Sequence, residues 1–378
     1  MKANRLIFGF TCVLEAAASR LSFSEPELEP ELHRCGIWDE VADVSTGPVQ
    51  EHGVAGTNDY MYVIGGISAN GSLPNFYSRR DVAAYNFDAK GWTRVADFPI
   101  DITHANAAGV DGGIYVLGGL TDNGKDGFWN YTTACYVYRP ETGKWDTLPP
   151  VPDHEARGAA AIGVYGSKII LAGGLRSVNL SAGVPGGIQK SVKWVTSFDT
   201  RTYKWMSLRP LPEPRDHAGG AVIKSKFYVM GGRDSGLENV KNNTWSLDLK
   251  TWSADWVPKR DLPGARAGFA VGIHRRRILV FGGEGKKNDA TGVYSTSLMY
   301  NTRRDTWKRV MDFPIPRHGM GAVSLVRNTW IAGGGLVEGR NKPSAYVSKF
   351  TLDDMMPPPD DLSFGAFDAD HHPAGCLI

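Results

Sequence analysis

The chain has 378 residues, of which 42% are hydrophobic and 22% are charged, a composition typical of a globular protein. Its formal net charge is +2, and no basic run interleaved with aromatic residues occurs, so we do not expect nucleic-acid binding. After residue 14 no apolar stretch approaches the ~20 residues needed to cross a bilayer, so we do not expect membrane association either.

The first residues have the pattern of a secretory signal peptide. Lys2 and Arg5 precede an apolar segment, residues 6–14, and Ala16–Ala18 supplies small residues for cleavage. We therefore expect a signal peptide over residues 1–18, a proline-spaced acidic linker over residues 19–37, and a location in the secretory pathway or outside the cell. An apolar leader that is never cleaved is the alternative.

The cysteines and the glycosylation sequons bear on the same question. Cys35 and Cys376 lie at the two ends of the expected folded region and could form a disulfide in an oxidising compartment, with free thiols as the alternative. The N-x-S/T sequons favour a secreted glycoprotein and stand at Asn70, Asn130, Asn179 and Asn242.

From residue 38 onward, a short apolar strand that ends in a glycine pair occurs six times. The spacings between successive pairs are 53, 55, 58, 51 and 51 residues, and the first glycines are Gly65, Gly118, Gly173, Gly231, Gly282 and Gly333. Each pair belongs to a unit of four expected strands, of which the first is rich in Gly and Ala and the fourth opens with tryptophan. A repeat of about fifty residues predicts one sheet per unit, packed against its neighbours.

The tryptophans set the number of units and how they close. Five of them are followed seven residues later by proline, namely Trp92, Trp145, Trp205, Trp256 and Trp307. The sixth unit ends at Phe350–Asp353 without such a strand, whereas Trp38 precedes the first unit. Because a ring of sheets has an open edge unless its ends pair, we expect the strand at Trp38 to complete the sixth sheet.

This combination of glycine pair, aromatic third strand and tryptophan resembles the kelch repeat. The resemblance implies an all-β fold, a six-bladed kelch-type β-propeller over residues 38–354 whose N-terminal strand closes the last blade, followed by a tail over residues 355–378.

One face of such a propeller is expected to carry the functional site. Chain direction alternates within a blade, so the start of the innermost strand and the loop after the glycine pair open on the same face. Candidate catalytic residues at the strand starts are His104, Arg157, His217, Arg266 and His318. Candidate substrate-binding residues in the loops are Trp129, Tyr131, Arg176, Arg233 and Glu284. Arg157 and Arg266 each stand sixteen residues before the first glycine of a glycine pair, and their alternative role is to brace the loop.

No metal and no other cofactor is expected, because the histidines come from four different blades around an axis. A galactose-oxidase-like copper oxidase and a sialidase-like hydrolase are weaker alternatives. The sequence shows neither the tyrosine, histidine and cysteine set of the former nor the Asp-box repeat of the latter. It also lacks a nucleophile elbow for a serine hydrolase.

Two functions fit these features. One is a cofactor-free cyclase or isomerase that holds an apolar, oxygenated small molecule and polarises a carbonyl. The other is a secreted kelch binding module for a glycan or a protein. An isolated propeller with a leader is similar to single-domain propeller enzymes of fungal natural-product pathways, including hetero-Diels–Alderases, and this likeness in architecture favours the enzyme. We expect a monomer with a pocket of a few hundred Å³ on the loop face.

Overall fold

A computed structural model describes residues 36–69, 76–122, 129–178, 188–339 and 341–352 of the protein. The expected signal peptide, the linker up to Cys35, and the C-terminal tail lie outside the described residues. Cys376, Asn70 and Asn179 lie outside them too. The leader, the disulfide and secretion therefore stay predictions. No helix within the described ranges is long and apolar enough to cross a bilayer.

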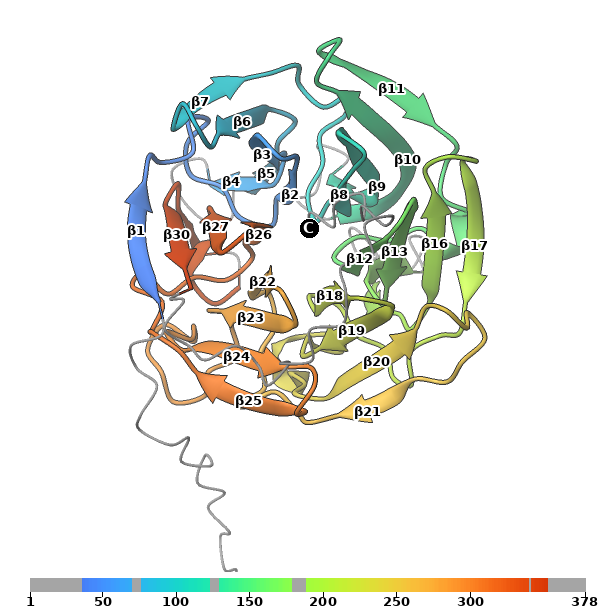
Figure 1. Ribbon diagram of the computed structural model, residues 1–378. Coiled ribbons are helices and arrows are strands. Elements are labelled where there is room, and N and C mark those ends of the chain that lie inside the picture. Colours follow the sequence, from blue (N-terminus) through green and yellow to red (C-terminus); the bar gives the residue numbers. More distant parts are fainter. Residues whose placement is uncertain (1–35, 70–75, 123–128, 179–187, 340, 353–378) are drawn as a thin grey trace, which may run out of the picture.

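Within the described ranges, six antiparallel four-stranded sheets surround a central axis as blades (Figure 1). This confirms the predicted all-β, six-bladed propeller. The innermost strands are β2 (Gly53–Gly56), β8 (Ala107–Val110), β12 (Ala161–Tyr165), β18 (Gly219–Ile223), β22 (Ala270–His274) and β26 (Gly321–Leu325). The second strands, which end at or run through the glycine pairs, are β3 (Tyr60–Ile64), β9 (Gly113–Asp122), β13 (Lys168–Ala172), β19 (Lys226–Met230), β23 (Arg277–Phe281) and β27 (Asn328–Ala332).

The third and fourth strands form the outer half of each blade. The third strands are β6 (Val82–Asn86), β10 (Trp129–Arg139), β16 (Val195–Asp199), β20 (Thr244–Asp248), β24 (Ser297–Asn301) and β30 (Val347–Thr351). The fourth strands are β7 (Gly91–Arg94), β11 (Lys144–Leu148), β17 (Lys204–Leu208), β21 (Val257–Lys259), β25 (Thr306–Arg309) and β1 (Ile37–Val41). The sixth blade therefore combines the two ends of the folded chain.

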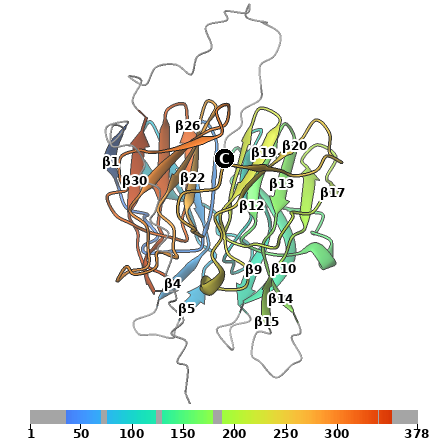
Figure 2. The ribbon, with the colours of Figure 1, turned by 90° about the horizontal axis from the view of Figure 1, so that it is seen from below.

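The loops after the glycine pairs gather on one face, as expected. Three of them form two-stranded hairpins: β4 (Ile67–Ala69) with β5 (Phe76–Ser78), β14 (Leu175–Val178) with β15 (Ile188–Ser191), and β28 (Gly335–Val337) with β29 (Asn341–Pro343). Figure 2 shows β4, β5, β14 and β15 together at the lower face of the ring. Short 3₁₀ helices, η2 (Asp153–Glu155) and η3 (Leu237–Asn239), lie in connecting segments.

The closure predicted from Trp38 is confirmed. Strand β1 pairs antiparallel with β30 from Ile37↔Thr351 to Val41↔Val347, which covers the open edge of the sixth blade. The Trp38 ring lies between the fifth and sixth blades, with its centroid 5.3 Å from that of Phe281 and 4.9 Å from that of Phe350.

The six tryptophans share one structural task, which explains their regular spacing. In each case the indole Nε1 donates a hydrogen bond to a backbone carbonyl of the preceding blade, at distances from 2.8 to 3.5 Å. The pairs are Trp92 with Ala42, Trp145 with Ala96, Trp205 with Pro149, Trp256 with Arg209, Trp307 with Arg260, and Trp38 with Met311. Each tryptophan thus links two neighbouring blades.

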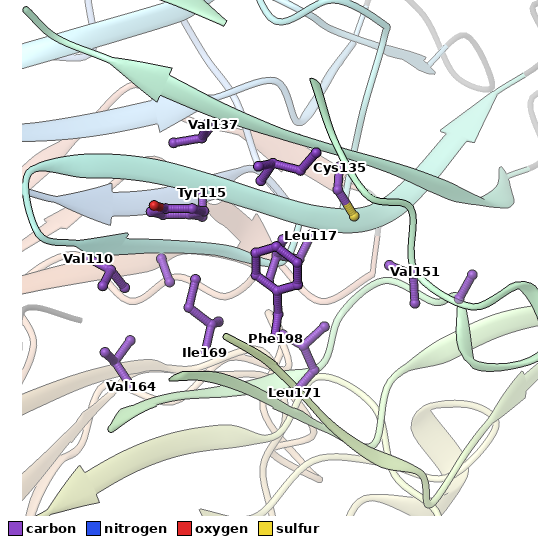
Figure 3. Close-up of a cluster of buried hydrophobic side chains, with 13 residues drawn as sticks. Val110, Tyr115, Leu117, Cys135, Val137, Val151, Val164, Ile169, Leu171 and Phe198 are labelled. Atoms are coloured by element: carbon purple, nitrogen blue, oxygen red, sulfur yellow. The ribbon is translucent and has the colours of Figure 1, made fainter. Parts of the chain in front are cut away.

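The core consists of apolar layers between blades rather than one central core. Figure 3 shows the layer between the second and third blades, where Leu117 and Val137 face Ile169 and Phe198. The axis itself is lined by small residues of the innermost strands, because six strands converge there.

The glycine pairs permit this close approach. Gly231 has φ +58°, and a Cβ at that position would come within 2.7 Å of the carbonyl oxygen of Arg266 in the next blade. The left-handed backbone and the lack of space both require glycine.

Candidate functional site

A closed ring of backbone hydrogen bonds surrounds the axis on the loop face. Each blade contributes one residue with φ between +51° and +61°, fourteen positions before its first glycine: Glu51, His104, Ala159, His217, Gly268 and Gly319. The N–H of each donates to the carbonyl of the equivalent residue in the preceding blade, at 2.7–3.1 Å. The ring holds these six positions close to one another across the axis.

A residue other than glycine is energetically unfavourable at these six positions, because their backbone is left-handed. A left-handed conformation costs a non-glycine residue roughly 1–2 kcal/mol, and glycine occupies the position in the fifth and sixth blades. The first, second and fourth blades instead place Glu51, His104 and His217 there. Strained residues of this kind are common at functional sites, which indicates a functional role for these three side chains.

Seven ionisable side chains from five blades meet at this ring, and we call them the axial cluster. They are Glu51, His104, Asp216, His217, Arg233, Glu284 and His318. Arg233 is the most exposed, with 17% of its side chain accessible, and Glu51 follows with 10%. The other five side chains are at most 3% exposed.

Glu51 lies at the centre of the axial cluster. Its Oε2 atom is 3.5 Å from His104 Nε2 and 3.3 Å from His217 Nε2. Its Oε1 atom is 3.8 Å from His318 Nδ1. Burial alone would raise the pKa of Glu51, but the neighbouring histidines, His217 first, hold that pKa well below its usual value. Glu51 is therefore a carboxylate.

The two histidines on Glu51 differ in their electrostatic environments. Burial lowers the pKa of His104 to about 3, against the pull of Glu51, so this imidazole is neutral. Burial and Arg233 also act against a charge on His217, but Glu51 and a short hydrogen bond from its Nδ1 to Asp216 raise its pKa to about 9. Asp216 also accepts a hydrogen bond from the hydroxyl of Ser191.

Arg233 connects the remaining carboxylates. Its Nε donates to Asp216 Oδ1 at 3.1 Å, and its Nη1 donates to Glu284 Oε1 at 2.5 Å. Glu284 Oε2 lies 3.3 Å from His318 Nδ1, while His318 Nε2 is 2.9 Å from the carbonyl oxygen of Val337. Polar groups of the fourth, fifth and sixth blades thus support the side chains at the centre.

A cavity of about 170 Å³ runs along the axis next to this cluster. Glu51, His52, His104 and His217 line it, and the rest of its wall combines small residues such as Ala107 and Gly220 with larger apolar ones such as Phe269 and Met320. The volume enclosed by described residues is smaller than the few hundred Å³ that we expected. It can hold a small ligand or one end of a larger one.

The structure brings together six of the ten candidate residues. His104, His217, His318, Arg233 and Glu284 belong to the axial cluster, and the Trp129 ring packs 4.8 Å from the ring of His104. Tyr131 and Arg176 instead form a separate contact, in which Arg176 stacks 3.9 Å above the Tyr131 ring. Both side chains bond Asp153 in the adjoining segment.

Arg157 and Arg266 occupy bracing positions away from the axial cluster. Each is at most 2% exposed, and each donates to the carbonyl of the first glycine of its own blade, Arg157 to Gly173 at 2.5 Å and Arg266 to Gly282 at 3.1 Å. Arg215 and Arg317 make the equivalent bonds. Burial lowers the pKa of Arg157 to about 10, which leaves it charged at neutral pH. This geometry favours the bracing role over the catalytic one.

Sequence reasoning missed Glu51 and Asp216. A signal was present, because Glu51 stands fourteen residues before its first glycine, as His104 and His217 do. Asp216 stands fifteen before, as His318 does. Both residues could have been found by aligning the six units on their glycine pairs and comparing the residue types at equivalent positions.

Comparison with known proteins agrees with this architecture. The family profile of the KLHDC2/KLHL20/DRC7 Kelch-repeats domain matches residues 181–356, and the Kelch motif matches residues 103–152. The chain belongs to the kelch-repeat β-propellers. The solved structure titled "Structure of YjhT" superposes with a TM-score of 0.68 at 18% identity, over 83% of this chain and 97% of that one, which shows the shared fold.

Curated relatives are similar over part of their length. Kelch-like protein terF of Aspergillus terreus is 34% identical over 314 residues, which cover 80% of this chain and 66% of the relative. Beta-scruin of Limulus polyphemus is 25% identical over 253 residues, 64% of this chain and 25% of the relative. The matches thus span less than two thirds of these relatives.

Proposed function

We propose that the protein is a cyclase or isomerase that binds the oxygenated end of a small molecule at the axial cluster. The observation that carries the proposal is a buried network of seven ionisable side chains, three of which, Glu51, His104 and His217, line the axial cavity. A protein partner makes contact through exposed residues, whereas only a small ligand reaches groups as buried as these. A fungal relative, Kelch-like protein terF of Aspergillus terreus, agrees with the likeness in architecture to propeller enzymes of fungal natural-product pathways.

Arg233 does not line the axial cavity, but it is the member of the cluster that we expect to act on such a ligand. It is the most accessible member of the cluster, and Asp216 and Glu284 fix its guanidinium from two sides. A positioned N–H donor stabilises negative charge that develops on a carbonyl oxygen, and removing one such donor typically slows a reaction about 10²–10³-fold. The ring of Trp129 is buried and packs against His104, which holds that imidazole in place at the cluster.

The reaction class that we infer is a hetero-Diels–Alder addition. An ortho-quinone methide contributes four atoms, ending in its carbonyl oxygen, and an alkene contributes two. One C–C and one C–O bond form while three π bonds become one, so nothing is oxidised and no group leaves. The protein needs only to orient both partners and to polarise the oxygen.

The test uses a quinone methide released in buffer from 2-hydroxybenzyl acetate, with 3-methylbut-3-en-1-ol as the alkene. The uncatalysed reaction gives a racemic chroman. With the full-length protein we expect a faster reaction and an enantiomeric excess, measured by chiral chromatography. Racemic product at every protein concentration would count against this reaction class.

We expect Arg233→Ala to remove the enantiomeric excess and to slow the protein-dependent reaction about 100-fold. The matched control is Arg139→Ala, since Arg139 makes an outer ion pair with Asp146 at 2.8 Å. The control should behave as wild type. An enantiomeric excess that survives in folded Arg233→Ala would place the reaction elsewhere on the protein.

A further inference from the structure

We propose that Glu51, His104 and His217 form a binding site for a divalent transition-metal ion, with Zn²⁺ as the ion of matching chemistry. Two imidazoles and one carboxylate are a ligand set that zinc uses in catalytic sites, where a fourth position stays open for water or substrate. The three donor atoms lie within 4.8 Å of one another. This proposal revises the expectation from sequence that no metal is bound.

The spacing of the donor atoms fits such an ion. With metal–ligand bonds of about 2.0–2.2 Å, neighbouring donors of a tetrahedral site lie about 3.3–3.5 Å apart. Glu51 Oε2 lies 3.3 Å from His217 Nε2 and 3.5 Å from His104 Nε2. The two imidazole rings have centroids 5.0 Å apart and nearly perpendicular planes, at 87°, so they do not stack face to face.

The other nitrogen of each histidine has a partner of the kind found around bound metals. His217 Nδ1 bonds the Asp216 carboxylate, which gives a carboxylate–histidine pair oriented toward the proposed ion. His104 Nδ1 lies 3.1 Å from the hydroxyl of Thr103. These contacts fix both rings with Nε2 facing Glu51.

The net charge of the axial cluster favours the binding of a dication. An ion bound at Nε2 would displace the proton of His217, after which three carboxylates face one guanidinium and two negative charges in a buried region are uncompensated. A divalent ion would neutralise them. Arg233 opposes the ion, since its Nη2 is 3.4 Å from His217 Nε2, but Asp216 and Glu284 both neutralise and hold it.

The backbone supports the same three residues. They are the ionisable members of the ring of equivalent positions, and they come from the first, second and fourth blades. The backbone hydrogen bonds of the ring fix their Cα atoms before any ion binds. If the proposed function holds, the ion would polarise the substrate oxygen beside Arg233, but binding of the ion can be tested without any activity.

The experiment titrates the full-length protein, stripped of metal with EDTA and dialysed, with ZnCl₂ in a calorimeter. We expect one Zn²⁺ per chain. His104→Ala and His217→Ala should each raise the dissociation constant at least about 100-fold, and Asp216→Asn should raise it about 10–100-fold by releasing the His217 ring. The control His154→Ala removes an exposed histidine in η2 and should bind as wild type.

Each variant is first compared with wild type by thermal unfolding in EDTA. Glu51→Gln serves as a second ligand variant if an alanine variant fails to fold, because it keeps the size of the side chain. The proposal fails if wild-type protein does not bind Zn²⁺ below about millimolar concentration. It also fails if the folded ligand variants bind Zn²⁺ as tightly as His154→Ala. Zinc binding together with a racemic chroman would instead overturn the proposed reaction and leave the metal site in place.

Discussion

Replacing Trp38 with alanine is expected to lower the free energy of unfolding by about 3–5 kcal/mol, the usual cost of truncating a large packed aromatic side chain. The Trp38 ring packs against Phe281 of the fifth blade and Phe350 of the sixth. Its indole also donates to the carbonyl of Met311 at 3.5 Å. Loss of the ring therefore weakens the pairing of β1 with β30, and unfolding in guanidinium chloride measures the change.

Trp252→Ala is the matched control. Trp252 lies in a turn before β21 and is half-buried, and its ring centroid is 6.3 Å from that of Tyr165. It does not follow the regular tryptophan spacing, and we expect a loss of about 1 kcal/mol or less. Equal losses in the two variants would contradict a special role for Trp38 in closing the ring.

Arg157→Met is expected to destabilise the protein by about 3–5 kcal/mol, because it removes a buried charged donor from several acceptors at once. Arg157 donates to the carbonyls of Gly173 and Leu171 and to the hydroxyl of Thr196. Methionine fills similar space but leaves these buried oxygens without their donor. Thermal or chemical unfolding measures the loss.

The control for this substitution is Arg94→Met, whose arginine has 63% of its side chain exposed and pairs with Asp97 at the surface. We expect a change of at most about 1 kcal/mol there. A catalytic Arg157 would behave differently. Its variant would keep the stability of the wild type and lose only the enantiomeric excess of the chroman, and that result would refute the bracing role.

The fold could be predicted from the sequence because its determinants are local and repeat in register. Each glycine pair is required by a left-handed backbone and a close neighbouring chain, as Gly231 shows. Each tryptophan reaches one carbonyl of the preceding blade. No strand opening with tryptophan follows Phe350, whereas Trp38 precedes the first unit. These two facts were enough to predict that the N-terminal strand completes the sixth blade.

The site could be predicted only in part, because its geometry depends on how side chains cross the axis. His104 and His217 were found from their residue type and position. Glu51 was not, although it occupies the equivalent position in its own unit. Only the ring of left-handed residues shows that side chains at this position point toward the axis. Arg157 looks equally functional in sequence, yet its position two residues earlier directs it into its own blade.

The expectation that no metal is bound rested on the separation of the histidines among blades. The structure removes that reason, because equivalent residues of neighbouring blades are close enough for backbone hydrogen bonds around the axis. Residues more than fifty positions apart in the sequence, such as Glu51 and His104, can therefore contribute to one coordination sphere. In this fold, side chains at equivalent positions of different blades are well placed to bind one metal ion together.

The central claim is that the ligand binds at the axial cluster. The most direct measurement is the anomalous scattering of bromine in crystals of the full-length protein soaked with a brominated analogue of the chroman product. We predict a bromine peak at the axial cluster, where Glu51, His104 and His217 line the cavity and Arg233 is the most exposed member. A peak at the separate Tyr131–Arg176 contact, a peak on the outer surface of the blades, or no peak at saturating ligand would contradict the claim.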